Sequence, residues 1–262
     1  MSSMAPGVPK NADPMQNAPS LSVLSLQFEV AEESSPDWPD LVIRVDGRDP
    51  FEGSRSGWRG FDPSSMLGED CPLIPTSSGR RVAVVRCGCG EAGCGSLAPL
   101  IVASVDGRRI SWLDFRDYVG VFAGPVVDEE IKPDWGRPKD LPDLHFDRDQ
   151  YLAEVERVRW DRGWETPRRR VARLVGERLL PLNLVLPPNL PFHGAGAAWP
   201  DNQGVVISFA LWGEGAEEQQ FSQKLLKLRS DLAEPEAAAE EMVQALLAVP
   251  PERWSETFGY RP

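Results

Sequence analysis

Three of the four cysteines in this 262-residue chain lie in one glycine-rich stretch, residues 81–100. Cys87, Cys89 and Cys94 are separated there mostly by small residues, and glycine occupies positions 88, 90, 93 and 95. Glycine adopts positive φ without a Cβ clash, so the chain can turn tightly at these positions. The stretch therefore predicts a hairpin that brings Cys94 back towards Cys87 and Cys89.

The segments on either side of the glycines are short, apolar and rich in β-branched residues. Residues 82–85 and 100–105 each predict a buried strand. The second run ends at Asp106-Gly107, a two-residue turn signal, and residues 109–115 return as a further strand. The pattern predicts an antiparallel β-meander with the cysteines at one tip.

Two further strands and a long loop precede the hairpin. Residues 21–30 alternate, with Leu24, Leu26, Phe28 and Val30 on one face, and residues 41–45 form the next apolar run. Residues 48–78 are rich in Pro, Gly and Ser and predict a loop. Because loops of this length usually have a role, that loop and nearby tryptophans are one candidate surface for a small ligand.

The second half of the chain contains signals for two or three helices and a β-hairpin. Asp147 followed by Gln150 is typical of a helix start, and Thr166-Pro167 and Glu234-Pro235 place a proline at the first helical position. Residues 204–212 alternate as a strand, and we interpret 219–228 as its hairpin partner.

These elements together predict an α+β fold. Residues 1–20 predict a disordered leader, 21–125 a β-rich half with the Cys/Gly hairpin, 126–142 a Pro-rich connection, and 143–262 a mixed half. We expect the two halves to pack as one unit.

The cysteine spacing allows three interpretations. Cys87, Cys89 and Cys94 are metal-like in spacing for a reducing compartment, and Cys71 would be the fourth ligand of a tetrahedral, structural zinc site, with His145 as the other candidate. Alternatively, the cysteines are free and pack as small apolar residues. A thiolate of lowered pKa in a turn crowded with N–H groups would instead make the hairpin a redox or catalytic site.

The charge of the chain limits its partners. The formal net charge of −12 repels nucleic acid and anionic membranes, so we expect neither as a partner and expect a protein partner with a basic surface. There is no run of about 18 apolar residues and no secretory pattern, which predicts a cytoplasmic protein with reduced thiols.

Other residues with chemical potential carry weaker signals. His193, in a Gly/Pro-rich segment, is a candidate general base, although no neighbouring partner is evident. The basic run 168–170, with Arg173 and Arg178, lies on an expected helix flanked by Glu165 and Glu177. We interpret it as a solvated helical face.

Several motifs together resemble a group of uncharacterised bacterial proteins found mostly in actinobacteria. The shared parts are the C-x-C-G-x-x-G-C hairpin at 87–94 and the segments 110–115, 146–151 and 161–165, within roughly residues 40–180. The resemblance implies common ancestry and a soluble bacterial protein, and it implies no mechanism. Cys71 lies outside the shared pattern.

The sequence favours a non-enzymatic binding or interaction protein whose Cys/Gly hairpin is structural and holds zinc. The alternative is a thiol-dependent enzyme or redox protein that uses Cys87, Cys89 or Cys94.

Overall fold

The computed structural model describes residues 20–30, 35–54, 57–68, 70–127, 135–198, 204–212 and 221–261. Two compact units are present. The first consists of the described residues up to 29 and between 40 and 161, and the second of those between 30 and 39 and from 162 onwards. The segment 126–142, expected as the boundary, lies inside the first unit, and the expectation that the halves pack as one unit stays a prediction. The expected leader lies almost wholly outside the described residues.

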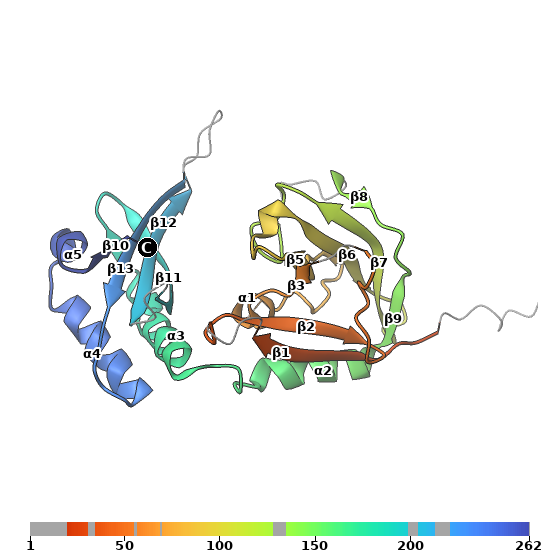
Figure 1. The fold of residues 1–262 in the computed structure, drawn as a ribbon, viewed down its shortest axis with the longest axis horizontal. Helices are drawn as coiled ribbons and strands as arrows, with labels where there is room; N and C mark the ends of the chain where they lie inside the picture. The colour runs from red at the N-terminus through yellow and green to blue at the C-terminus, as the bar shows by residue number, and fades with distance from the viewer. Residues whose placement is uncertain are drawn as a thin grey trace, which may run out of the picture. The chain divides into compact units, whose positions relative to one another are not determined.

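The first unit is mainly β-structure with short helices (Figure 1). Its elements in chain order are β1 (Leu24–Val30), β2 (Pro39–Val45), β3 (Trp58–Arg59), α1 (Pro63–Leu67), β4 (Arg80–Arg81), β5 (Val85–Cys87), the short 3-10 helix η1 (Ala92–Cys94), β6 (Ser96–Ala103), β7 (Arg109–Tyr118), β8 (Arg137–Pro138), β9 (Leu144–Asp147) and α2 (Arg148–Trp160).

The strands of this unit close into a ring. One sheet runs β3-β5-β6-β7, with β9 also paired to β7, and β1 pairs with β2 in a second sheet. Single bridges join the two sheets at both ends, between Ser22 and Phe146 and between Leu41 and Phe61. The ring leaves few unpaired strand edges of the kind that promote aggregation.

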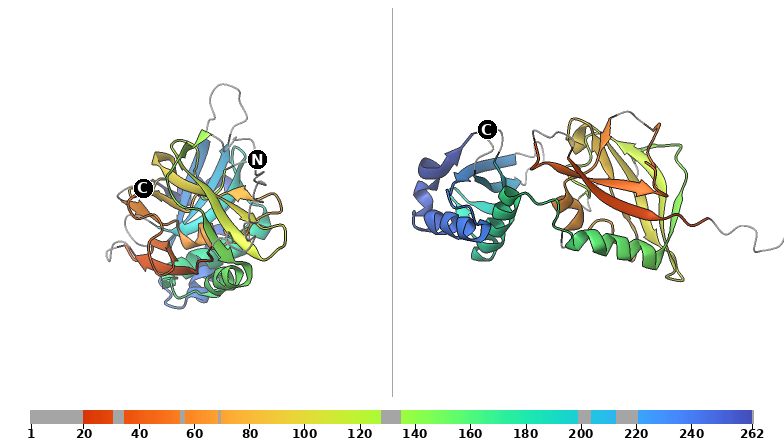
Figure 2. Two further views of the ribbon diagram at one scale, coloured as in Figure 1. Left: turned by 90° about the vertical axis from the view of Figure 1, so that its right-hand side faces the viewer. Right: turned by 60° about the horizontal axis from the view of Figure 1, so that its bottom comes forward.

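The free edge of β1 is covered by side chains of α2, which runs alongside it (Figures 1 and 2). Gln150 donates to the Leu24 carbonyl and accepts from its amide, at 2.8 and 3.3 Å. Glu154 accepts from the Leu26 amide at 2.6 Å, and Arg157 donates to the Leu26 carbonyl at 2.8 Å. Side chains on successive turns of the helix thus replace a neighbouring strand.

The core of the first unit centres on Trp112, which is fully buried. Its ring centroid lies 5.6 Å from that of Phe146 and 6.4 Å from that of Tyr151, both in edge-on geometry. The Trp112 indole donates to the Tyr151 hydroxyl, which itself donates to the Leu73 carbonyl at 2.8 Å. The buried polar atoms of this aromatic cluster are therefore hydrogen-bonded.

The second unit is an antiparallel sheet packed against helices. Its elements are α3 (Pro167–Leu179), the 3-10 turn η3 (Leu180–Leu182), β10 (Val185–Leu186), β11 (Leu190–Ala197), β12 (Val205–Trp212), β13 (Phe221–Leu228), α4 (Pro235–Leu247), α5 (Pro251–Phe258) and β14 (Gly259–Tyr260). The strands follow the order β10-β11-β12-β13-β14. Apolar residues of α3, α4, α5 and the sheet form a single core.

The α+β fold, the antiparallel strands and the hairpin in the second half are confirmed. The helix starts at Asp147 and Thr166 are also confirmed, because both side chains accept hydrogen bonds from first-turn amides. The second half contains one helix more than expected, α5, and the Gly/Pro-rich segment around His193 forms strand β11. The loop expected at 213–218 lies outside the described residues.

Two expected strands and one expected loop differ from the structure. Residues 82–84 lie between β4 and β5, opposite Pro99 of β6, which has no N–H to donate to a neighbouring strand. In β1 the buried face ends early, since Phe28 is half-buried and Val30 is exposed. The long expected loop contains β3 and α1.

Candidate functional site

The Cys/Gly hairpin is a hydrogen-bonded turn between β5 and β6. The Gly90 amide donates to the Cys87 carbonyl at 2.9 Å, and the Cys94 amide donates to the Glu91 carbonyl at 3.2 Å. The Cys87 amide donates to the Gly95 carbonyl at 2.8 Å, which closes the hairpin at its base. These backbone hydrogen bonds therefore bring Cys94 back towards Cys87.

Two glycines of the hairpin are required by geometry. Gly90 has φ of +91°, a conformation that side chains with a Cβ rarely adopt. At Gly88 an added Cβ would lie 2.5 Å from the Gly57 carbonyl oxygen. Close backbone contact at Gly88 thus seats the hairpin beside the strand β3.

The ionisation of Cys89 is influenced by its neighbours in the turn. The backbone N–H of Glu91 first, and the thiols of Cys87 and Cys94 after it, hold the pKa of Cys89 below its ordinary value. The interaction with Cys89 and the negative charge of its thiolate raise the pKa of Cys94. The site therefore pairs a stabilised thiolate with a neighbouring thiol that keeps its proton.

The accessibility of these thiols differs from that of the fourth cysteine. Cys89 and Cys94 are exposed and Cys87 is half-buried. Cys71 is buried, and its thiol donates to the Met66 carbonyl at 3.2 Å. Burial raises the pKa of Cys71. The structure thus gives Cys71 the environment of a packed core residue, which differs from that of the hairpin thiols.

His145, the other candidate fourth ligand, belongs to a different contact. It lies on β9, and its Nδ1 atom is 2.9 Å from the hydroxyl oxygen of Ser111 on the paired strand β7. The Ser111–His145 pair had no signal in the sequence, because the two residues meet only through strand register.

A structural zinc site takes four ligands. Within the described ranges, no group of three or more His, Cys, Asp and Glu side chains is arranged to hold a metal ion. The Cys71 thiol donates to the Met66 carbonyl, and His145 is paired with Ser111. The four-ligand zinc site stays a prediction.

A buried carboxylate anchors the base of the hairpin. Asp40 on β2 is 4% exposed and accepts from Arg59 Nε at 2.8 Å and from Arg86 Nη2 at 3.3 Å. Arg86 also donates to the carbonyls of Gly60 and Gly90, at 2.9 and 2.6 Å. One guanidinium therefore ties the tip of the turn to the neighbouring strands. Asp40, Arg59 and Arg86 were not identified from the sequence.

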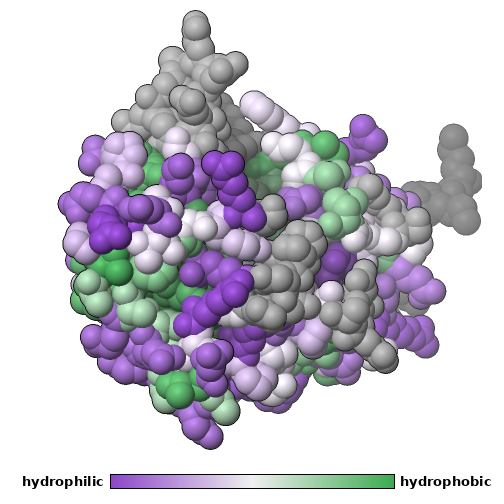
Figure 3. Space-filling model, turned by 60° about the vertical axis from the view of Figure 1, so that its left-hand side comes forward, coloured by the Kyte–Doolittle hydropathy of each residue, from purple (hydrophilic) through white to green (hydrophobic). Residues whose placement is uncertain are grey.

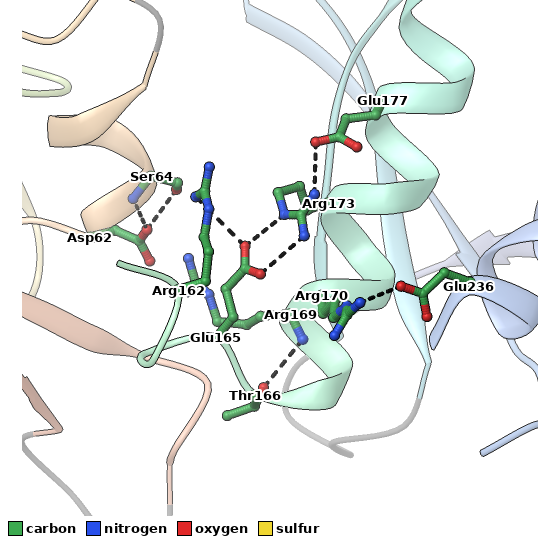
Figure 4. Close-up of polar contacts among 10 residues, drawn as sticks. All are labelled: Asp62, Ser64, Arg162, Glu165, Thr166, Arg169, Arg170, Arg173, Glu177 and Glu236. Carbon is green, nitrogen blue, oxygen red and sulfur yellow. Dashed lines mark hydrogen bonds and ion pairs between the residues drawn. The ribbon is translucent and has the colours of Figure 1, made fainter. Parts of the chain in front are cut away.

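The basic run on α3 is paired with acidic residues of its own unit (Figure 4). The ion pairs are Arg168 with Asp37, Arg170 with Glu236, Arg173 with Glu165 and Glu177, and Arg178 with Glu240. Arg169 donates to the Asp37 carbonyl at 2.7 Å and covers the Trp164 ring. These ion pairs and hydrogen bonds give the arginines a structural role in the second unit.

The remaining candidate residues have no described contact that suggests catalysis or ligand binding. His193 is exposed on β11. Exposed apolar side chains of the second unit include Leu180, Leu182 and Val185, and the face in Figure 3 shows hydrophobic residues as separate patches among hydrophilic ones. Exposed apolar residues scattered in this way are ordinary at protein surfaces.

Comparisons with protein-family models, with curated proteins and with solved structures find no match to this chain. None of the helices in the described part of the chain has the length and apolar character needed to cross a bilayer.

Proposed function

We propose that the Cys/Gly hairpin is a thiol–disulfide site in which Cys89 is the attacking thiolate and Cys94 completes the disulfide. The observation that supports this proposal most directly is that Cys89 and Cys94 are both exposed on one backbone-closed turn, where the Glu91 N–H lowers the pKa of Cys89. Exposure of both Cys89 and Cys94 gives a reagent access to them.

The exchange is a two-electron oxidation with a low-molecular-weight disulfide as the oxidant. The Cys89 thiolate attacks one sulfur of the reagent, which forms a mixed disulfide and releases a thiolate that takes up a proton. Cys94 then loses its proton and attacks the Cys89 sulfur, which breaks the mixed disulfide and releases the second thiolate. Two cysteine thiols become one disulfide, and the reagent becomes two thiols.

Cys87 has a supporting position in this scheme. Its thiol contributes to the lowered pKa of Cys89, so it stabilises the thiolate without being consumed. A disulfide between Cys89 and Cys94 closes a larger and less constrained ring than one between Cys87 and Cys89.

The zinc site and the basic protein partner are expectations from the sequence. A structural zinc ion at the hairpin would use the same thiols and would protect them from reagents. Binding to a basic protein partner in the cytoplasm follows from the net charge and from composition. Both stay predictions, as does the resemblance to the bacterial group.

The decisive experiment measures metal and thiol reactivity on one sample purified under reducing conditions. Metal content is determined by mass spectrometry, and alkylation by iodoacetamide is followed at each cysteine by peptide mass spectrometry. We expect no bound zinc and faster alkylation of Cys89 than of Cys94 at neutral pH, because the lower pKa of Cys89 leaves more of it as the thiolate. Cys71 serves as the internal buried control.

Treatment with a small disulfide should then link Cys89 to Cys94 with the loss of two hydrogen atoms. The C89S variant should lose this product, whereas C71S should form it as the wild type does. One equivalent of zinc with protected thiols, or equally slow alkylation of all four cysteines, would overturn the proposal.

A further inference from the structure

Arg59 lies next to the hairpin turn. It is opposite Arg86 in the β3–β5 pair, while its neighbour Trp58 is opposite Cys87. Its Nη1 atom lies 3.8 Å from the position that a Cβ would take on Gly90, the residue after Cys89. A positively charged group therefore borders the turn that carries the attacking thiol.

Asp40 fixes the orientation of the Arg59 side chain. The Arg59 Nε atom donates to Asp40, a carboxylate that is itself buried and held by Arg86. The Arg59 side chain is 26% exposed, so part of the guanidinium reaches solvent. Within the described part of the chain, Arg59 has no second carboxylate partner.

The local charge favours an anion. Two guanidinium groups, Arg59 and Arg86, share the single carboxylate of Asp40, so Arg59 keeps part of its hydrogen-bonding capacity for an anion, although Glu91 adds a negative charge in the same turn. Above Gly90 there is room, because, apart from the chain neighbours Cys89 and Glu91, Arg59 Nη1 is the one described atom within 4 Å of the Cβ position. A guanidinium in a fixed orientation is well suited to hydrogen-bond a carboxylate.

We infer that Arg59 makes this hairpin selective for disulfides that carry a carboxylate, by binding that carboxylate while Cys89 attacks. This inference rests on the proposed thiol–disulfide function and names the class of its substrate. Arg59 is a substrate-binding residue in this scheme and takes no part in the electron transfer.

The test compares a charged disulfide with an uncharged one. Glutathione disulfide carries carboxylates, and bis(2-hydroxyethyl) disulfide carries no charge. Rates of Cys89–Cys94 disulfide formation are measured with each reagent for the wild type, for R59Q and for R148Q, a matched control at an exposed arginine on α2 that pairs with its neighbour Asp149. Protection of Cys71 from alkylation confirms that each variant is folded.

We expect R59Q to lower the ratio of the glutathione rate to the uncharged-reagent rate by about fivefold, the size expected for a partly exposed ion pair. R148Q should leave the ratio unchanged. In the wild type, raising the salt concentration to about 0.5 M should lower the rate with glutathione disulfide and leave the other rate unchanged, because salt screens exposed charges. The salt series gives the answer even if R59Q does not fold.

The outcomes separate the two proposals. If neither reagent oxidises the hairpin of the wild type, the thiol–disulfide function is wrong. If both reagents oxidise it, but the ratio is insensitive to R59Q or, where that variant does not fold, to salt, the role of Arg59 is wrong and the thiol–disulfide function stands.

Discussion

Replacement of Asp40 by alanine tests how much the hairpin base contributes to the stability of the first unit. Asp40 holds Arg59 and Arg86 through contacts of 2.8 and 3.3 Å, and its side chain is 6% exposed. A hydrogen bond to a charged group contributes about 1.5–3 kcal/mol, and the longer contact lies at the low end of that range.

The net cost is smaller than the sum of the two contacts. The arginine side chains are 26% and 20% exposed, so water replaces part of what the carboxylate provides. We therefore expect D40A to lower the free energy of unfolding by about 3 kcal/mol, near the lower limit for breaking a buried ion pair. This corresponds to a roughly hundredfold larger unfolded population, since about 1.4 kcal/mol changes an equilibrium tenfold.

Cys71 provides a reporter for this unit alone. Because the thiol is buried, alkylation requires opening of the core, and its rate follows the population of the open form when closing is fast. We expect peptide-resolved alkylation of Cys71 to be about a hundredfold faster in D40A than in the wild type.

The matched control is E29A, which removes the carboxylate from an ion pair with Arg44 of similar length, 3.3 Å. Glu29 is 52% exposed, and such a surface pair contributes at most about 1 kcal/mol, or roughly fivefold in the alkylation rate. If D40A changes the rate by no more than E29A does, the hairpin base is not a stabilising element and the argument from burial fails.

Three further predictions concern other parts of the two units. A G60A variant should lose about 3 kcal/mol of stability in urea unfolding, because the new Cβ would lie 2.1 Å from a backbone oxygen, whereas G124A meets no atom within 4 Å and should unfold like the wild type. Burial opposes ionisation of Glu154, but its hydrogen bonds to Arg157 and to a β1 amide outweigh burial and hold the pKa of Glu154 below its usual value. Its stabilising effect is therefore present above the unfolded-state pKa of about 4.3 and is lost as pH falls through the lower folded-state pKa, so the wild type should lose more stability in acid than E154Q when both are compared by circular dichroism. W254F removes an indole N–H that donates to two backbone carbonyls at 2.9 and 2.7 Å and should cost about 1–3 kcal/mol in urea unfolding; a cost near zero would mean that water satisfies both carbonyls.

Elements determined by neighbouring residues could be predicted from the sequence. The caps at Asp147 and Thr166 follow from side chains that hydrogen-bond amides two or three residues later. Strand β12 follows from strict alternation, and the turn at Gly107 has the positive φ that the Asp-Gly pair indicates. Each of these signals is contained within a few residues.

Features that depend on distant residues could not be predicted. Asp40 meets its arginine partners across 19 and 46 positions, and an acidic chain offers many carboxylates that look equivalent in sequence. Closure of the ring depends on two single-residue bridges, which have no periodic pattern. Cys71 is buried and its thiol donates to the Met66 carbonyl, and cysteine spacing does not distinguish a ligand from such a core residue, so its role in a zinc site stays a prediction.

Whether the hairpin is held by its backbone or by its thiols distinguishes the structural from the reactive interpretation of its cysteines. Backbone hydrogen bonds close the turn, and Arg86 holds its tip through the Gly90 carbonyl, so contacts outside the thiols hold the hairpin. If this is correct, a variant with Cys87, Cys89 and Cys94 all replaced by serine should keep the first unit folded, with Cys71 alkylated within about fivefold of the wild-type rate, a change of about 1 kcal/mol. A structural metal site would give the opposite result, because loss of its ligands removes the folding energy that the metal supplies. Rapid alkylation of Cys71 in the triple-serine variant would therefore show that the thiols stabilise the fold, and it would favour the zinc hypothesis over a reactive Cys89.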